Sequence, residues 1–301
     1  MTPRIAASLR RSLLAVALAS VCAPAFADDG EVAAPTTGGK LLLTGGVTQL
    51  EGAGGGGLTP WALIGGYGTQ GQWGASAFYT RVNVGDYHLD DVGALVSWND
   101  RIEFSVAQQR FNTEGVGAAL GLGQGFTFKQ DIIGVKVRIA GEAVLDADRA
   151  MPQIAVGLQY KKNDQGAVLG AIGAKDDSGL DIYVSATKLF LAQGILLNGT
   201  VRFTKANQIG ILGFGGDLHD SYKPQFEVSA AYLLTRKLAI GAEYRTKPNN
   251  LGIARESDWY DVFVAYAPTR HVSVTVAYAD LGNIVIRDHQ RGIYASLQVG
   301  F

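Results

Sequence analysis

An alternation of apolar and polar residues with a period of two constrains this chain more than any other feature of its sequence. From residue 40 onward the alternation recurs over stretches of 8 to 11 residues, each closed by turn-forming residues. In the last stretch, residues 291–301, every odd position from Ile293 to Phe301 is apolar. A period of two places successive side chains on opposite faces of a β-strand. The sequence therefore predicts an all-β fold.

These stretches predict about 14 strands in an antiparallel up-and-down barrel, with 12 as the alternative because the first two are glycine-rich and weakly patterned. The expected strands are residues 40–50, 60–67, 73–84, 89–98, 101–111, 126–140, 152–162, 180–190, 195–205, 224–234, 237–247, 258–267, 271–280 and 291–301. Their connections are short at one end and mostly longer at the other. This asymmetry is typical of a transmembrane barrel with short periplasmic turns and longer external loops.

Aromatic residues indicate which face of the predicted barrel points outward. A soluble barrel or sandwich alternates in the same way, with its apolar face inside. Here the aromatic members of the apolar face lie near strand ends; they are Trp98, Tyr160, Tyr232, Tyr244, Tyr260, Tyr266, Tyr278 and Phe301. Two such girdles are expected where a membrane meets water. Since about eight strands is the limit for a barrel filled by packed side chains, we expect the apolar face to contact lipid.

Both ends of the sequence carry features of an exported barrel. Residues 1–27 resemble a Sec signal peptide, with a basic start, an apolar stretch of nine residues and cleavage after Ala27. Residues 28–39 would follow as a short periplasmic segment, and residues 40–301 would form the barrel. Phe301 resembles the terminal signal by which outer-membrane proteins are recognised for assembly. The expected location is therefore the outer membrane.

Composition and motifs exclude several classes of protein. With 26 basic and 27 acidic side chains, the chain offers no basic face for nucleic acid. A single cysteine cannot build a disulfide framework or a thiolate zinc site. The glycine run at 54–57 lacks the Lys-Ser/Thr and the helix of a phosphate-binding loop. His271 and Ser273 share a face but lack an evident acidic partner for catalysis. We expect no cofactor, no metal and no enzymatic activity.

The polar face of the predicted strands carries a cluster of charges. Its members near the loop side, on four successive strands, are Arg202, Glu227, Glu243, Arg245 and Asp261. Such a ring could narrow a pore and set its selectivity, or its paired charges could simply tie the strands together. Glu103 and Arg138 are expected to pair near the turn side. Because basic and acidic residues balance on this face, we predict no strong ion selectivity.

Three functions follow from these residues. The first is a passive channel for small solutes. The second is a barrel filled by its own loops, with a structural or envelope-assembly role. The third is an uptake channel for hydrophobic or aromatic compounds with an N-terminal plug, which residues 28–39 are too short to form. Besides small solutes, the expected partners are outer-membrane lipid, lipopolysaccharide and the barrel-assembly machinery.

Several motifs resemble a proteobacterial family that carries a domain of unknown function. They are Gly38 to Val47, Glu51 to Trp61, Lys161 to Asn163, Thr204 to Gln208, Leu212 to Gly216 and Ala242 to Arg245. The resemblance extends over roughly residues 38–301. It implies a porin-like outer-membrane barrel and supplies no substrate or active site. Loops carry function more often than scaffolds do, so residues 205–223 are the first region in which we expect a site.

Overall fold

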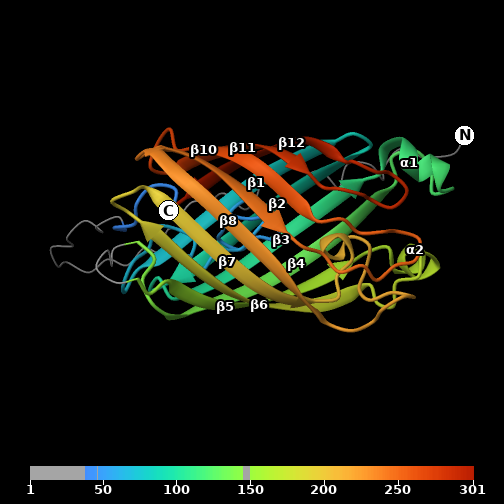
Figure 1. Ribbon diagram of the computed structural model, residues 1–301, viewed down its shortest axis with the longest axis horizontal. Helices are drawn as coiled ribbons and strands as arrows, with labels where there is room; N and C mark the ends of the chain where they lie inside the picture. The colour runs from blue at the N-terminus through green and yellow to red at the C-terminus, as the bar shows by residue number, and fades with distance from the viewer. Residues whose placement is uncertain (1–37, 46, 145–149) are drawn as a thin grey trace, which may run out of the picture. The chain divides into compact units, whose positions relative to one another are not determined.

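The computed structural model describes residues 38–45, 47–144 and 150–301, and these form a closed antiparallel barrel of 12 strands (Figure 1). The strands are β1 (Trp73–Val84), β2 (Tyr87–Trp98), β3 (Ile102–Asn112), β4 (Thr127–Ala140), β5 (Gln153–Asn163), β6 (Ser178–Phe190), β7 (Ile195–Thr204), β8 (Lys223–Thr235), β9 (Leu238–Arg245), β10 (Trp259–Tyr266), β11 (Val272–Asp280) and β12 (Arg291–Gly300). The connections contain the short helices α1 (Glu114–Ala119), α2 (Gly166–Ala171) and η1 (Gln208–Gly210). None of the helices in the described ranges is long and apolar enough to cross a membrane.

Each strand pairs with its neighbours in the sequence, and β1 pairs with β12 to close the barrel. The antiparallel up-and-down barrel is therefore confirmed, with the alternative count of 12 strands in place of about 14. From β1 onward, the first and last residues of each predicted strand lie within two positions of the observed ones. The predicted signal peptide, with its cleavage after Ala27, and residues 28–37 lie outside the described residues.

The barrel has two unlike ends. At the turn end the connections are mostly short, such as residues 99–101 and 236–237, and the C-terminus lies there (Figure 1). At the loop end the connections are mostly longer and carry α1 and α2 (Figure 1). The exceptions are residues 85–86, a short connection at the loop end, and residues 141–152, a longer one at the turn end.

Alternation along the strands sorts the side chains between the outside and the lumen. Outward residues such as Phe104, Ile133 and Val262 are exposed, by 54%, 60% and 64%. Gln159 and Asp181, which point into the lumen, are fully buried. An outer face of this character on a closed barrel is typical of a protein embedded in lipid, where closure leaves no unpaired edge.

Residues 47–67, which we call the lumen segment, run inside the barrel and form no part of its wall. Every residue from 48 to 67 is buried, and isolated bridges between Thr48 and Gly54 and between Gly55 and Pro60 fold the segment back on itself. The strands expected at 40–50 and 60–67 are therefore wrong. Glycine is depleted in strands because it offers no side chain to pack. The backbone of this segment bonds instead to side chains of the wall.

The lumen segment also corrects the expectation about a plug. It enters and leaves at the turn end, where Lys40 pairs with Asp100 at 2.7 Å and the Tyr67 N–H donates to the Phe301 carbonyl at 2.7 Å. Its tip, at Glu51, lies deep in the lumen. Residues 47–67 thus plug the lumen, whereas residues 28–37 lie outside the described residues.

Apolar side chains fill the lumen on both sides of this tip. Those toward the turn end include Leu43, Trp61, Leu189, Leu196 and Phe263. Those toward the loop end include Tyr87, Phe111, Ile211, Leu212 and Trp259. The charged side chains around Glu51 therefore form a layer between two apolar regions.

Candidate functional site

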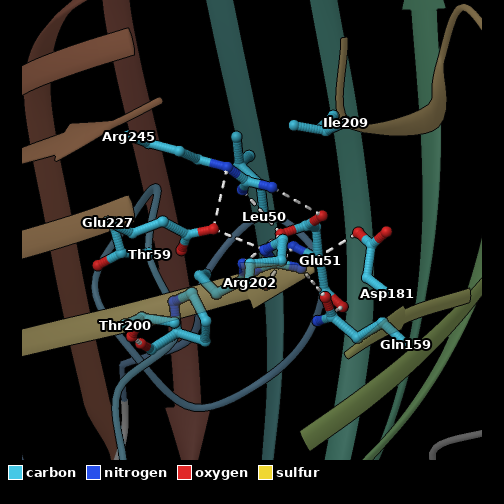
Figure 2. Close-up of polar contacts among 12 residues, drawn as sticks. Leu50, Glu51, Thr59, Gln159, Asp181, Thr200, Arg202, Ile209, Glu227 and Arg245 are labelled. Atoms are coloured by element: carbon cyan, nitrogen blue, oxygen red, sulfur yellow. Dashed lines mark hydrogen bonds and ion pairs between the residues drawn. The ribbon is translucent and has the colours of Figure 1, made fainter. Parts of the chain in front are cut away.

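Glu51 lies at the tip of the lumen segment, and three basic side chains of the wall surround its carboxylate (Figure 2). Arg245 of β9 donates to it from both terminal nitrogens, at 2.8 and 3.3 Å. Arg202 of β7 forms an ion pair with it at 3.1 Å, and Lys161 of β5 donates a hydrogen bond to it. All four side chains are buried. A charge buried this deeply is stable only when it is paired in this way.

Two acidic residues of the wall hold these three bases in place. Asp181 of β6 accepts from Lys161 at 2.6 Å and from Arg202 at 3.3 Å. Glu227 of β8 accepts from Arg202 Nε at 2.6 Å and pairs with Arg245 Nε at 3.4 Å. Side chains opposite each other on neighbouring strands lie about 5 Å apart. Alternation on successive strands therefore builds a continuous layer of acids and bases.

Two further wall carboxylates bind the backbone of the lumen segment. Glu243 of β9 accepts from the Leu58 N–H at 2.6 Å. Glu103 of β3 accepts from the N–H groups of Gly54 and Gly65, at 3.0 and 2.7 Å. These bonds satisfy buried N–H groups that no neighbouring strand reaches.

The glycine run at 54–57 lets the lumen segment approach these carboxylates closely. A Cβ atom at Gly56 would lie 1.9 Å from Glu243 Oε1. The same oxygen accepts from the Thr59 hydroxyl at 2.7 Å, so it is not free to move aside without loss of a bond. The glycine run is therefore required sterically, because a side chain at Gly56 would collide with Glu243.

The connection between β7 and β8 closes the lumen from the loop end. Lys161 Nζ donates to the Ile209 carbonyl at 3.1 Å, and Asn163 Nδ2 donates to the Ile211 carbonyl at 2.9 Å. Ile209 and Ile211 are buried. Because Lys161 also bonds to Glu51, its side chain links the connection between β7 and β8 to the tip of the lumen segment.

A second ion pair anchors that closure. Lys247 and Glu256, in the connection between β9 and β10, pair at 2.9 Å. Burial lowers the pKa of the Lys247 ammonium and raises the pKa of the Glu256 carboxyl. Glu256 also accepts from the Gln208 N–H at 2.9 Å. The connection between β9 and β10 therefore helps to hold η1 in place.

Residues 44–298 match the family model described as "Protein of unknown function (DUF3034)". The chain belongs to this family. The match confirms the predicted membership of a family of unknown function. No curated protein matches the chain.

Solved structures of outer-membrane proteins are similar to this DUF3034 member at low identity. The KdgM porin in complex with disordered oligogalacturonate is 11% identical, over 75% of this chain and 99% of that chain, with a TM-score of 0.47. Omp33 of Acinetobacter baumannii is 7% identical, over 76% and 98% of the two chains, with a TM-score of 0.46. Outer membrane phospholipase A from Escherichia coli is 9% identical, over 78% and 94%, with a TM-score of 0.43. These similarities indicate no activity for this chain.

The motifs that indicated the DUF3034 family contain much of the site. The motif Glu51 to Trp61 forms the tip and the returning part of the lumen segment. The motif Lys161 to Asn163 contains Lys161, which bonds both to that tip and to the connection between β7 and β8. Ala242 to Arg245 supplies two side chains that bind the lumen segment. Thr204 to Gln208 and Leu212 to Gly216 flank the turn that carries Ile209. The region 205–223, expected to carry function, thus takes part in closing the lumen.

The structure divides the predicted loop-side cluster. Arg202, Glu227 and Arg245 belong to the network around Glu51, and Glu243 binds the lumen segment. Asp261 of β10 is buried, and neither of its carboxylate oxygens has a hydrogen-bond partner in the part of the chain that the structure describes. These residues therefore do not form one ring around an open pore.

Glu103 and Arg138 have partners other than each other. The register places Glu103 opposite Lys136, and the two pair at 3.1 Å. Arg138 pairs with Asp100 and Glu142, at 2.8 and 2.9 Å, beside a cavity of about 480 Å³ at the turn end. The expected pair is wrong because alternation identifies the face of a residue but does not fix the register. Lys136 and Arg138 share a face two residues apart.

The eight aromatic residues predicted near strand ends all lie on the outer face, with exposed fractions between 41% and 61%. Those toward the turn end are Trp98, Tyr232, Tyr266 and Phe301, and those toward the loop end are Tyr160, Tyr244, Tyr260 and Tyr278. Some of these tyrosines donate a hydrogen bond from the hydroxyl group to a polar neighbour; Tyr260, for example, donates to Asp280 at 2.6 Å. An apolar ring with a polar tip suits the boundary between lipid and water.

Sequence reasoning missed Glu51, which it placed in a connection between the first two expected strands. A signal was present, because Glu51 is the only charged residue between Lys40 and Arg81. Lys161 and Asp181 also lie outside the expected cluster. Strand pairing across β5, β6 and β7 brings them beside Arg202.

Among the described residues, no group of three or more His, Cys, Asp or Glu side chains is arranged to hold a metal ion. His271 stacks on the ring of Phe301 and lies 2.8 Å from the Gly300 carbonyl. These contacts give His271 a structural role at the end of β12.

Proposed function

We propose that this protein is an outer-membrane channel for small solutes whose lumen is closed by its own lumen segment and opens when that segment moves. The observation that supports it is the combination of a charged lumen wall with a separate segment that fills the lumen and is no part of the wall. The exposed apolar outer face and the two sets of aromatic side chains support a position in lipid. In this proposal residues 1–27 direct Sec export, lipid and lipopolysaccharide surround the barrel, and Phe301 serves as the assembly signal.

The lumen segment is suited to movement because it shares no β-ladder with the wall. It enters and leaves at the turn end, so it can withdraw without breaking any pairing between β1 and β12. Besides apolar packing, it is held by polar bonds to the wall, such as those of Glu243 to Leu58 and of Glu103 to Gly54. Water can replace such bonds when the segment leaves.

The chemistry of the wall also favours a gate over a permanent filler. A buried ion network contributes little net stability compared with apolar packing of the same volume. A barrel that is filled only for stability gains little from charges at Lys161, Asp181 and Arg202. The same charges are suited to a lumen that holds water when open.

Single-channel recording in planar bilayers tests this function. We expect the natural protein to stay closed for most of the recording, because the lumen segment and the connection between β7 and β8 both block it. A variant that lacks residues 47–66 removes the first closure, and a second variant that also lacks residues 207–213 removes both. Stable conductance steps in either variant support a gated channel.

Silence of both deletion variants contradicts the proposal, provided that circular dichroism shows each to be a folded β-barrel. That result favours the second candidate, a barrel filled permanently by its own chain with a structural role. The observation in favour of this candidate is that the lumen is closed from both ends. Lys162→Ala, an exposed change on the outside of β5, is the matched control and should record like the natural protein.

A further inference from the structure

We propose that the lumen wall carries a binding site for small organic carboxylates, built from Lys161, Arg202 and Arg245. In the closed barrel the carboxylate of Glu51 occupies this site. The proposal rests on the gated channel proposed above and names the class of solute that the open lumen would bind.

The contacts of Glu51 are those of a bound carboxylate. Arg245 presents Nη1 to Oε2 at 2.8 Å and Nη2 to Oε1 at 3.3 Å, which is the two-pronged geometry that arginine forms with carboxylates. Arg202 approaches Oε2 at 3.1 Å and Lys161 bonds to Oε1. Both oxygens of one planar group are thus held by cations from three different strands.

The wall orients these cations independently of Glu51. Glu227 binds both arginines, and Asp181 binds Arg202 and Lys161. Gln159 also accepts from Arg202 at 2.7 Å, and the ring of Tyr183 lies 5.2 Å from the guanidinium carbon. Because these contacts come from the strands, the site should keep its shape when the lumen segment leaves.

Charge then favours an anion in place of Glu51. Within the network the wall supplies three cations but only two carboxylates, those of Asp181 and Glu227. Asp91 of β2 is a further acid near Glu51, but neither of its oxygens bonds to any base in the described residues. Withdrawal of Glu51 therefore leaves a buried cation without its partner, which is costly unless another anion replaces it.

Chemical rescue of the full-length Glu51→Ala variant tests the site. The substitution removes the tethered carboxylate and leaves room for a free one, so acetate should raise its thermal unfolding midpoint in a saturable way. Acetamide, which has the same shape without the charge, should bind about tenfold more weakly or worse, since a charge-assisted hydrogen bond is lost. Benzoate and inorganic phosphate, tested in the same way, define the size and the type of anion.

Two controls separate binding in this site from a general salt effect. Glu51→Gln keeps the side-chain volume and should show no stabilisation by acetate, because it leaves no space. Glu51→Ala combined with Arg245→Gln removes the two-pronged donor and should lose most of the acetate response. If sodium chloride stabilises Glu51→Ala as well as sodium acetate does, the proposal is wrong.

The same titration distinguishes this proposal from the proposed channel. If Glu51→Ala does not fold, the variant lacking residues 47–66 presents the same wall and replaces it. A variant that conducts ions but shows no acetate dependence overturns the carboxylate site alone. Acetate binding by Glu51→Ala, together with silence of both deletion variants described above, supports the site and contradicts the channel.

Discussion

Strands β3 to β9 line the lumen differently from strands β10, β11, β12, β1 and β2. The first half carries the paired charges, and its side chains bond to the lumen segment, as Glu103 and Glu243 do. Buried polar atoms without a hydrogen-bond partner in the described ranges are more frequent in the second half, where they belong to Ser76, Asp91, Trp259, Asp261, Thr275, Tyr294 and Gln298, than in the first, where they belong to Gln130, Arg202 and Glu227. The lumen segment thus bonds mainly to the first half of the wall, and the second half offers it fewer bonds, those of Ser97 to the Gly65 carbonyl at 2.6 Å and of Gln298 to the Thr48 carbonyl at 3.4 Å.

This difference bears on whether the segment is a gate. A buried polar group without a partner costs about 1–3 kcal/mol, and nearly all such groups in folded proteins are paired. A filler that served stability alone would be expected to match both halves of the wall. A wall that is polar but less completely matched on one side is expected where water or solute passes when the segment moves. The comparison therefore favours the gate, and substitutions on each half test it.

Lys161→Met should cause the largest loss of stability, because Lys161 belongs to the matched half. The substitution leaves Glu51 and Asp181 short of one cation in a buried site, and breaking a buried pair costs about 3–5 kcal/mol. Thermal unfolding in detergent, followed by circular dichroism, measures the loss. Lys162→Met on the outside of the same strand is the control, since its pair with Asp177 at the surface contributes about 0–1 kcal/mol. Equal unfolding midpoints for the two variants would contradict the role of the network.

The wall of the barrel could be predicted from the sequence because strand alternation is a local property. Every strand from β1 onward shows the period of two within its own residues, and turn-forming residues mark its ends. The lumen segment could not be predicted in the same way. Its conformation depends on a wall that exists only after β1 meets β12, and its glycine-rich sequence resembles two weak strands.

The site shows the same limit at the level of single residues. Alternation correctly placed Arg202, Glu227 and Arg245 in the lumen, but it could not supply their partner. Glu51 and Arg245 are 194 residues apart, and no local pattern links them. Strand register is equally non-local, which is why Glu103 pairs with Lys136 rather than with Arg138.

Gly56→Ala should have an intermediate effect on the matched half. The added Cβ would lie 1.9 Å from Glu243 Oε1, so Glu243 must give up its bonds to Leu58 and Thr59 or the segment must shift. Overpacking of this kind costs about 1–3 kcal/mol, and we expect a higher open probability in bilayers as well. Gly199→Ala is the control, because its Cβ meets no atom within 4 Å. A variant at Gly56 that is as stable and as closed as the one at Gly199 would argue against close contact between the segment and the wall.

Asp261→Asn should have the smallest effect, because Asp261 lies on the less matched half and its carboxylate has no hydrogen-bond partner among the described residues. We expect its unfolding free energy to change by less than about 1 kcal/mol or to rise, since an amide at this buried position cannot carry an unpaired charge. Asp181→Asn is the comparison on the matched half, where charge-assisted bonds from Lys161 and Arg202 are each worth about 1.5–3 kcal/mol. Urea unfolding of both variants measures the difference. An equal loss of unfolding free energy in the two variants would mean that Asp261 contributes as much to stability as Asp181. The two halves of the wall would then not differ, and the argument for a gate would fail.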